Sequence, residues 1–485
     1  MLSNATLYEP VIGLEVHAEL RTRSKMFCSC PVVDSVSAPP NTAVCPVCAG
    51  MPGTLPVVNQ MAVEYGLRVA LALECTVNPV SIFARKNYFY PDLPKGYQIS
   101  QYEQPLAEHG RIVIETAAGE KVIRVRRVHL EEDTGKLTHV SERGYSLLDL
   151  NRAGVPLLEI VSEPDMRSVE EARAYAEALR DILRTLEVNS GDMEKGVIRF
   201  EANISVRPVG TDVFNTRVEI KNLNSFRALE RATAFEIERQ TKRMEAGEKV
   251  EQETLGWDEA NETTYSQRSK EDAHDYRYFP EPDLPPLWVE EAWLESIRAN
   301  LPELPRARRR RFMEQYGLSD YDARLLTGEK ALADYFERAV NGKSKIHPKS
   351  LANWMTGELF GLMNQANITV ADLRVSPEAL AELVGLVASG EINPSTGKTV
   401  LAEMFQSGKG AAEIVAARGL RQVSDAAFIA DIVRQVLEEN PNEVASFKAG
   451  KQTVVNWLFG QVMRKAGGKA NPGVVRAELE RQLGE

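Results

Sequence analysis

The chain has 485 residues, of which 43% are hydrophobic and 26% charged, and its formal net charge is −11. This composition excludes the collagen-like and disordered classes, and the negative charge excludes a protein that coats nucleic acid by bulk electrostatic attraction. The length is too great for one ordinary core and predicts two to four domains.

No run of about 18 apolar residues occurs in the sequence, so we expect no membrane span. The first twenty residues lack the basic start and the continuous apolar stretch of a signal peptide. We therefore expect a cytoplasmic protein, in which stable disulfides are rare and paired cysteines more often bind metal.

The segment "VIGLEVHAEL" places Glu15 and His17 two residues apart in a strand-like apolar pattern, so both side chains point from the same face. Taken singly, each polar residue of this kind is at least as well explained by a solvated strand. Together, charged residues inside apolar strand patterns indicate a site for Mg²⁺ and phosphate. The other candidates are Glu131, Glu132, Asp133, Asn151, Arg152, Glu159, Glu163, Arg199, Glu201, Asn203, Arg217, Glu219, Lys221, Asn222 and Asn224.

Four of the five cysteines lie between residues 27 and 50, as the pairs Cys28-x-Cys30 and Cys45-x-x-Cys48. A Cys-x-x-Cys pair supplies two zinc ligands from one tight turn, and four thiolates leave no open position for a substrate. We predict a structural zinc site here, with unligated or oxidised thiols as the alternative. Cys75 lies in an apolar stretch and is expected to be an inert buried thiol.

Residues 83–105 combine aromatic and basic side chains. This mixture suits stacking on bases together with phosphate contacts, and it equally suits a proline-rich loop that packs its aromatic rings on a sheet. Sequence spacing leaves the two interpretations open. The residues concerned are Phe83, Tyr88, Phe89, Tyr90, Tyr97 and Tyr102, with Arg85, Lys86 and Lys95 among them.

Alternation of apolar and polar residues predicts a hairpin over residues 111–130 and a strand over 196–208. Helices are predicted at 168–186, where Ser168 and Glu171 form a capping box, and at 225–247, which opens with Ser225. These elements predict a mixed α/β first part of the chain.

Four prolines between residues 277 and 293 mark a domain boundary, after which helical periodicity continues almost throughout. A second break follows near residues 408–410. We therefore predict domains at 1–295, 296–410 and 411–485. Residues 441–485 contain seven Lys and Arg against four Glu, a local excess of three positive charges on an otherwise acidic chain.

The segment Gly390–Thr399 ends in Gly-Lys-Thr, as phosphate-binding loops do. Six residues separate its two outer glycines, where the motif needs four. We interpret it as the end of one helix and the start of the next. ATP, if used, must bind to a different kind of scaffold.

Several long segments together resemble the B subunit of the tRNA-dependent amidotransferases, in order and over essentially the whole chain. They are "GLEVHAEL", "RKNYFYPDLPKGYQISQ", "HLEEDTGK", "DLNRAGVPLLEIVSEPD", "EIKNLNSF", "DYRYFPEPDLPPL" and "NWLFGQVMRKAGGKANP". The resemblance implies an α+β fold: an N-terminal mixed α/β cradle domain with an antiparallel sheet, an all-helical domain and a small helical tail domain.

The resemblance also implies a reaction. ATP would phosphorylate the side-chain carboxylate of Glu-tRNA(Gln), Asp-tRNA(Asn) or both, and ammonia would then displace the phosphate. The implied partners are a glutaminase A subunit, which supplies the ammonia, and a small C subunit in a heterotrimer, with misacylated tRNA as substrate. The implied cofactors are ATP, Mg²⁺ and a structural Zn²⁺.

Residue roles carried over from the family are expectations. Glu15, His17, Glu132, Glu159 and Glu201 would form the Mg²⁺ and ATP site, whereas Lys86 and Arg152 would contact phosphate or the aminoacyl group. The zinc ligands would be Cys28, Cys30, Cys45 and Cys48, in a loop over residues 27–50. The tRNA contacts would be Lys448, Lys451, Arg464, Lys465 and Lys469.

Two other functions fit the same sequence less well. A non-catalytic, zinc-stapled subunit for tRNA binding or assembly would have no use for the clustered carboxylates. A stand-alone ATP-dependent ligase or kinase would be expected to show a conventional nucleotide loop. The sequence has no nucleophilic cysteine with a nearby histidine, so the chain is expected to need a partner for its ammonia.

Overall fold

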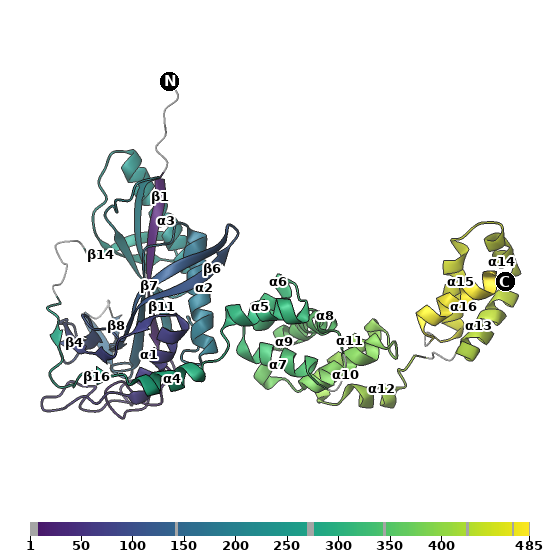
Figure 1. The fold of residues 1–485 in the computed structure, drawn as a ribbon, viewed down its shortest axis with the longest axis horizontal. Coiled ribbons are helices and arrows are strands. Elements are labelled where there is room, and N and C mark those ends of the chain that lie inside the picture. Colours follow the sequence, from purple (N-terminus) through teal and green to yellow (C-terminus); the bar gives the residue numbers. More distant parts are fainter. Residues whose placement is uncertain are drawn as a thin grey trace, which may run out of the picture. The chain divides into compact units, whose positions relative to one another are not determined.

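The computed structural model describes residues 8–140, 144–268, 276–342, 346–422, 426–467 and 470–484. The chain divides into two compact units, residues 1–304 and 305–485, and each is described by itself. The first unit is built on sheets and the second on helices (Figure 1), which confirms the predicted α+β class.

A nine-stranded sheet is the frame of the first unit, with the order β14-β13-β12-β11-β1-β10-β7-β6-β2. All neighbours pair antiparallel except β12 and β13, so the predicted antiparallel sheet is confirmed. The strands are β1 (Tyr8–Glu19), β2 (Thr76–Val77), β6 (Ala107–Thr116), β7 (Gly119–Glu132), β10 (Pro156–Ser162), β11 (Ile198–Pro208), β12 (Val218–Leu223), β13 (Thr254–Asp258) and β14 (Thr263–Arg268).

The predicted hairpin over residues 111–130 is confirmed as β6 and β7, which are joined by a tight turn beyond the pair Thr116 and Gly119. The predicted strand over 196–208 is β11. The aromatic segment is not simply a loop, because it forms β4 (Phe83–Asn87) and β5 (Tyr97–Gln101), which pair in a smaller sheet with β15 (Phe279–Pro280). Two further pairs are β3 (Val80–Ser81) with β16 (Leu287–Trp288) and β8 (Lys136–Val140) with β9 (Tyr145–Asp149).

The two faces of the large sheet differ in polarity because side chains alternate along each strand. In β1, Leu14, Val16 and Ala18 are at most 1% exposed and belong to the main core. Glu15 and His17 point from the opposite face. Residues of α1 (Gln60–Ala72), α2 (Val169–Thr185), α3 (Phe226–Glu245) and α4 (Glu291–Ala299) complete this core, which leaves the polar face available for a site.

The two predicted long helices are confirmed as α2 and α3. The Ser168 hydroxyl accepts a hydrogen bond from the backbone N–H of Glu171, and Ser225 caps α3 in the same way through Ala228. The Glu171 carboxylate accepts from the backbone N–H of Arg167, one residue before the N-cap, so the predicted capping box is closed one residue earlier than expected.

The second unit consists of helices with two cores, one drawn from residues 312–415 and one from residues 429–483. The finer division of this unit at residue 410 stays a prediction. The helices are α5 (Pro305–Tyr316), α6 (Asp320–Thr327), α7 (Lys330–Val340), α8 (Pro348–Asn353), the π-helix η3 (Trp354–Leu359), α9 (Phe360–Ala366), the 3₁₀ turn η4 (Val370–Asp372), α10 (Pro377–Ala388), α11 (Pro394–Ser407), α12 (Ala411–Arg418), α13 (Ala426–Glu439), α14 (Pro441–Lys448), α15 (Val454–Lys465) and α16 (Pro472–Gly484).

The segment with the Gly-Lys-Thr ending lies where one helix stops and another begins. Asn393 caps α11, and Lys398 and Thr399 belong to that helix, so no phosphate loop forms. Within the ranges that the structure describes, we find no helix with the length and apolarity needed to traverse a bilayer.

Substitution of Gly110 tests the packing of β6. A methyl group there would meet Cys75 Sγ and would lie 2.7 Å from the carbonyl oxygen of Leu73, which already accepts a hydrogen bond from Arg111. The carbonyl oxygen belongs to the backbone and Cys75 is buried, so we expect Gly110→Ala to lower the free energy of unfolding by about 1–3 kcal/mol. Urea unfolding of the full chain measures this change.

Gly13→Ala is the matched control, because its added methyl would lie 3.6 Å from the nearest atom, in Pro164. We expect that change to stay within about 0.5 kcal/mol. Equal losses for the two variants would contradict the proposed overpacking at β6.

Candidate active site

The polar face of the large sheet carries a cavity of about 880 Å³. Its floor comes from β1, β7, β10, β11 and β12, and its wall includes residues from β4 and from the segment around Tyr276 and Tyr278. The lining is rich in ionisable groups of both signs. The volume lies within the usual range of small-molecule sites, and the charged lining suits a polar ligand.

Strand register brings the charged residues into rows. His17 on β1 lies directly opposite Glu159 on β10, which in turn lies opposite His129 on β7. Glu15 lies opposite Glu201 on β11. Residues that face one another across antiparallel strands have Cβ atoms about 5 Å apart. Glu15 and Glu201 are therefore neighbours in the fold, although they are 186 positions apart in the sequence.

The first acidic group consists of Glu131, Glu159 and His17, whose ligand atoms lie within 4.8 Å of one another. His17 Nε2 is 3.3 Å from Glu159 Oε2 and 3.6 Å from Glu131 Oε1. His129 Nε2 is also 3.3 Å from Glu159 Oε2. The Glu159 carboxylate therefore lies between two imidazoles.

The second acidic group consists of Glu15, Glu201 and Glu219, again within 4.8 Å of one another. Lys221 Nζ lies 2.9 Å from Glu201 Oε2 and 3.2 Å from Glu219 Oε1. His17 Nδ1 is 4.0 Å from Glu201 Oε1. His17 belongs to the first acidic group, and its imidazole also lies beside the second.

Burial makes the charges in this cavity interact strongly. Although burial by itself lowers the pKa of His17, the hydrogen bond and charge of Glu159 and the charges of Glu201 and Glu131 raise it to about 9. Burial and the neighbouring carboxylates Glu159, Glu201 and Glu219 raise the pKa of Glu15. Carboxylates held this close repel one another, and a bound cation would relieve that repulsion.

The donor set of both groups fits Mg²⁺. Carboxylate oxygens are the protein ligands that Mg²⁺ prefers, with water and substrate phosphates completing its shell. Glu131 and Glu159 could hold one ion, joined by His17 once its imidazole has given up a proton, and Glu15, Glu201 and Glu219 could hold another. Against the burial that disfavours charge, His129 and His17 lower the pKa of Glu159, which keeps this carboxylate ionised.

Cationic side chains form the rest of the lining. Arg152 donates hydrogen bonds to the carbonyl oxygens of Thr134 and Gly135 and lies 3.6 Å from Asp133. The ammonium group of Lys86 lies 5.0 Å from the centre of the Tyr276 ring. Among the described residues, the buried Nε of Arg127 has no hydrogen-bond partner, so this guanidinium keeps a donor free for an anion.

The structure brings six of the seven predicted catalytic residues to this cavity. Those that line it are Glu15, His17, Lys86, Arg152, Glu159 and Glu201. Glu132 does not line it. Its carboxylate accepts hydrogen bonds from Lys95 Nζ and from the backbone N–H of Ile99, and its side chain is 5% exposed.

Glu131 lines the cavity in place of Glu132. The two differ because successive side chains of β7 point to opposite faces: His129 and Glu131 share the cavity face, and Leu130 belongs to the core on the other. Side chains alternate between the two faces of a strand, and Leu130 is apolar. From the sequence, this alternation could have predicted that Glu131 faces the polar side. His129 had no such signal, since a lone histidine in a strand is compatible with many roles.

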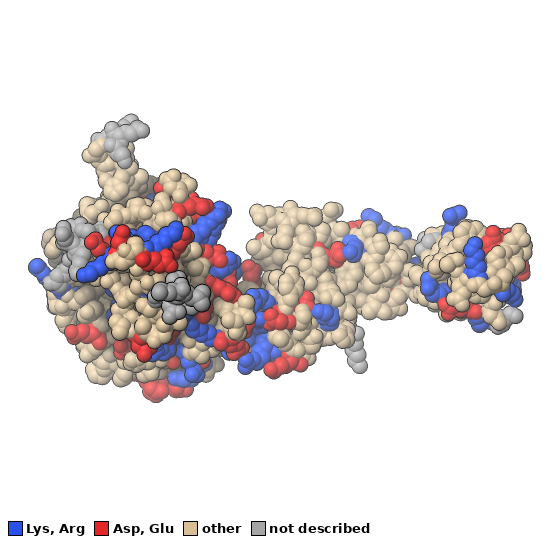
Figure 2. Space-filling view, turned by 90° about the horizontal axis from the view of Figure 1, so that it is seen from above, with Lys and Arg blue, Asp and Glu red and all other residues tan. Residues whose placement is uncertain are grey.

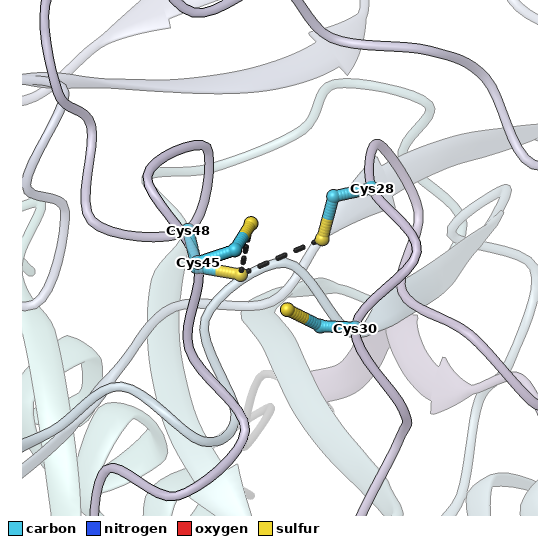
Figure 3. Close-up of side chains that lie close together, drawn as sticks. All are labelled: Cys28, Cys30, Cys45 and Cys48. Atoms are coloured by element: carbon cyan, nitrogen blue, oxygen red, sulfur yellow. Dashed lines mark hydrogen bonds between the residues drawn. The ribbon is translucent and has the colours of Figure 1, made fainter.

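The four clustered cysteines do not line this cavity, and they turn their sulfurs toward a common centre (Figure 3). Cys28 Sγ is 3.5 Å and Cys45 Sγ 3.7 Å from Cys48 Sγ. A disulfide would need about 2.05 Å, whereas ligands 2.3 Å from one tetrahedral zinc are about 3.8 Å apart. All four are free thiols, and their placement fits a structural zinc site.

Comparisons with known proteins agree across both units. The family described as the GatB/GatE catalytic domain matches residues 10–295, and the one described as the GatB domain matches residues 334–483. The B subunit of the aspartyl/glutamyl-tRNA(Asn/Gln) amidotransferase from Myxococcus xanthus is 53% identical over 478 residues, which cover 99% of both chains. The protein of the same name from Moorella thermoacetica is 54% identical over 478 residues, 98% of this chain and 100% of its own.

Titration of His17 tests the geometry of the cavity. We expect the imidazole in metal-free protein to keep both protons up to about pH 9, because Glu159 lies beside it. A pKa raised from the ordinary 6.5 means that the stabilisation is complete below about pH 6.5 and is lost as the pH rises through 9. NMR of ¹⁵N-histidine-labelled protein measures this pKa.

Glu159→Gln is the control, since it keeps the shape of the side chain and removes the nearest negative charge. The pKa of His17 should fall in this variant. A wild-type value at or below 6.5 would show that His17 does not lie among these carboxylates.

Proposed function

The chain belongs to the family of aspartyl/glutamyl-tRNA(Asn/Gln) amidotransferase B subunits, and from this premise we propose that its cavity activates a carboxylate with ATP. The side-chain carboxylate of Glu-tRNA(Gln), Asp-tRNA(Asn) or both attacks the γ-phosphorus, ADP leaves, and an acyl phosphate forms. Ammonia then attacks the acyl carbon, phosphate leaves, and the amide results. One observation carries this proposal: both acidic groups described above and several cationic side chains lie in the same cavity.

The reaction needs positioning and charge stabilisation, and no covalent bond to the protein. Mg²⁺, when bound, would neutralise charge on the phosphate oxygens. The acidic groups would hold it through Glu131, Glu159 and His17, and through Glu15, Glu201 and Glu219. Among the cations, Lys86 and Arg127 would contact phosphoryl oxygens. Arg152, held by two carbonyl groups, would orient the aminoacyl carboxylate.

A separate subunit would supply the ammonia. The fifth cysteine, Cys75, is buried, and burial raises the pKa of its thiol to about 12. A thiol of this kind is not a nucleophile at neutral pH. We therefore propose a glutaminase A subunit and a small C subunit as partners in a heterotrimer.

Helices at the end of the chain would contact tRNA. Lys448, Lys451 and Arg464 are exposed, at the end of α14, just before α15 and at the end of α15. A 12-residue helix is about 18 Å long, so these groups could meet phosphates several nucleotides apart. Lys465 pairs with Glu439, an exposed contact of little net energy. Lys469 lies outside the described residues.

Basic side chains are spread over the visible face of residues 426–484 and are mixed with acidic ones (Figure 2). A mixed surface of this kind favours a few specific phosphate contacts over attraction by one continuous patch. This agrees with the modest local excess of positive charge in the sequence.

A pair of neighbouring variants tests the proposed activation step. Glu131→Gln and Glu132→Gln each remove one negative charge and keep the side-chain shape, yet only Glu131 lines the cavity. We expect Glu131→Gln to lower kcat for ATP-dependent transamidation by about 10²–10³-fold, as loss of one charge-stabilising group does. Glu132→Gln breaks the ion pair with Lys95 and should mainly lower Tm.

The assay uses the full chain with its A and C partners, ATP, Mg²⁺, glutamine and each misacylated tRNA in turn. The reverse result, with Glu132→Gln inactive and Glu131→Gln active, would place the metal shell around Glu132. If the wild-type complex binds tRNA and never cleaves ATP, the non-catalytic assembly role replaces this proposal.

Removal of basic residues from the tail tests the tRNA contacts. We expect Lys448→Ala with Lys451→Ala to weaken tRNA binding and to reduce the slope of log affinity against log salt by about 0.7–0.9 per lost contact. Filter binding at several salt concentrations gives both quantities. Arg434→Ala on α13, which pairs with Asp431, is the control for loss of one basic side chain elsewhere on the tail and should leave the slope unchanged.

A further inference from the structure

Lys25 is a fully buried lysine beside the four cysteines, with 0% of its surface exposed. Its Nζ donates a hydrogen bond to Cys48 Sγ, at 3.4 Å, and another to the carbonyl oxygen of Leu150, at 3.1 Å. Among the described residues, no carboxylate oxygen lies within 4.0 Å of this ammonium group. Deprotonated to hold a metal, this sulfur would be the anion nearest to the charge.

A buried ammonium group without an anionic partner is strongly destabilising. A zinc ion held by four thiolates carries a net charge of −2, and a cation in hydrogen-bond contact with one sulfur offsets part of it. The positive ammonium group and the negative zinc–thiolate centre therefore stabilise each other. Burial of Lys25 has a physical reason once the four thiolates hold a metal.

The backbone of Lys25 ties it to the other half of the cysteine cluster. Its N–H donates to the carbonyl oxygen of Cys30, 2.9 Å away, whereas its side chain reaches Cys48. One residue thus spans both cysteine pairs. The backbone contact holds the Lys25 main chain against the first cysteine pair, and the two hydrogen bonds of Nζ hold the end of its side chain.

The Leu150 contact leads from the cysteines to the cavity. Asn151, the next residue, receives the backbone N–H of Ala43 on its Oδ1 and donates through Nδ2 to the carbonyl oxygen of Pro39. The residue after it, Arg152, lines the cavity.

We propose that Lys25 is the counter-cation of the zinc–thiolate centre and that, through the Leu150 carbonyl, it lets the bound metal position Arg152. Lys25 is a positioning residue and touches no reacting atom. The inference rests on the zinc site proposed for these cysteines and goes beyond it, since a zinc site that only staples its own loop needs no buried cation.

Zinc affinity is the first test, measured on the full chain by competition with a chromophoric chelator. Lys25→Met keeps the length of the side chain and removes the charge and its hydrogen bonds. We expect it to weaken zinc binding by about 10–100-fold, as loss of an outer-shell partner does. Lys121→Met is the control, because it removes an equal charge that pairs with Glu171 on α2, and it should leave zinc affinity unchanged.

Hydrogen–deuterium exchange of residues 148–155 is the second test. Removal of zinc should speed exchange there in wild type, whereas in Lys25→Met exchange should be fast with or without zinc. A purely local role for Lys25 would leave this segment unaffected and would overturn the link to Arg152.

These measurements distinguish a wrong zinc site from a wrong role for Lys25. If wild type takes up no zinc, the proposed zinc site is wrong and this inference falls with it. If wild type binds zinc and Lys25→Met binds it equally well, only the role of Lys25 is overturned. Should Lys25→Met not fold, a crystal structure of zinc-loaded wild type decides: the ammonium group must be in hydrogen-bond contact with Cys48 Sγ.

Discussion

The antiparallel register of β1 with β10 and β11 is the constraint on which the candidate active site depends. It sets His17 opposite Glu159 and Glu15 opposite Glu201, and at the same time sends Leu14 and Val16 into the core. A slip by one residue would exchange the two faces, burying carboxylates among apolar side chains. The hydrophobic core therefore fixes the alignment of the charged residues.

That alignment has an electrostatic cost. Carboxylates of both acidic groups are largely buried; against this burial, neighbouring cations and imidazoles lower the pKa of Glu159 and of Glu201, whereas burial and the other carboxylates raise the pKa of Glu15. Replacing such buried ionic networks with apolar residues often stabilises a protein. Charge patterns that conflict with local stability are expected at functional sites, and this one is confined to the face of the sheet that the core does not use.

Much of this could be predicted from the sequence, because period-two alternation, helix caps and cysteine spacing are local signals. The hairpin of β6 and β7 and the helices α2 and α3 follow from them. Glu132, selected from the family resemblance, does not line the cavity, because alternation along the strand turns Glu131 toward it; the roles of both residues stay predictions. The role of Lys25 had no local signal, as its partners Cys48 and Leu150 lie 23 and 125 residues away.

The position of β1 in the sheet has a consequence for synthesis of the chain. This first strand of the sequence is central in space, and its two neighbours begin only at Pro156 and Ile198. At translation rates of about 5–20 residues per second, the ribosome needs roughly 10–40 s to make both neighbours. Until Ser162 has been made, neither edge of β1 has its neighbouring strand, and its apolar side chains stay exposed in a state that favours aggregation.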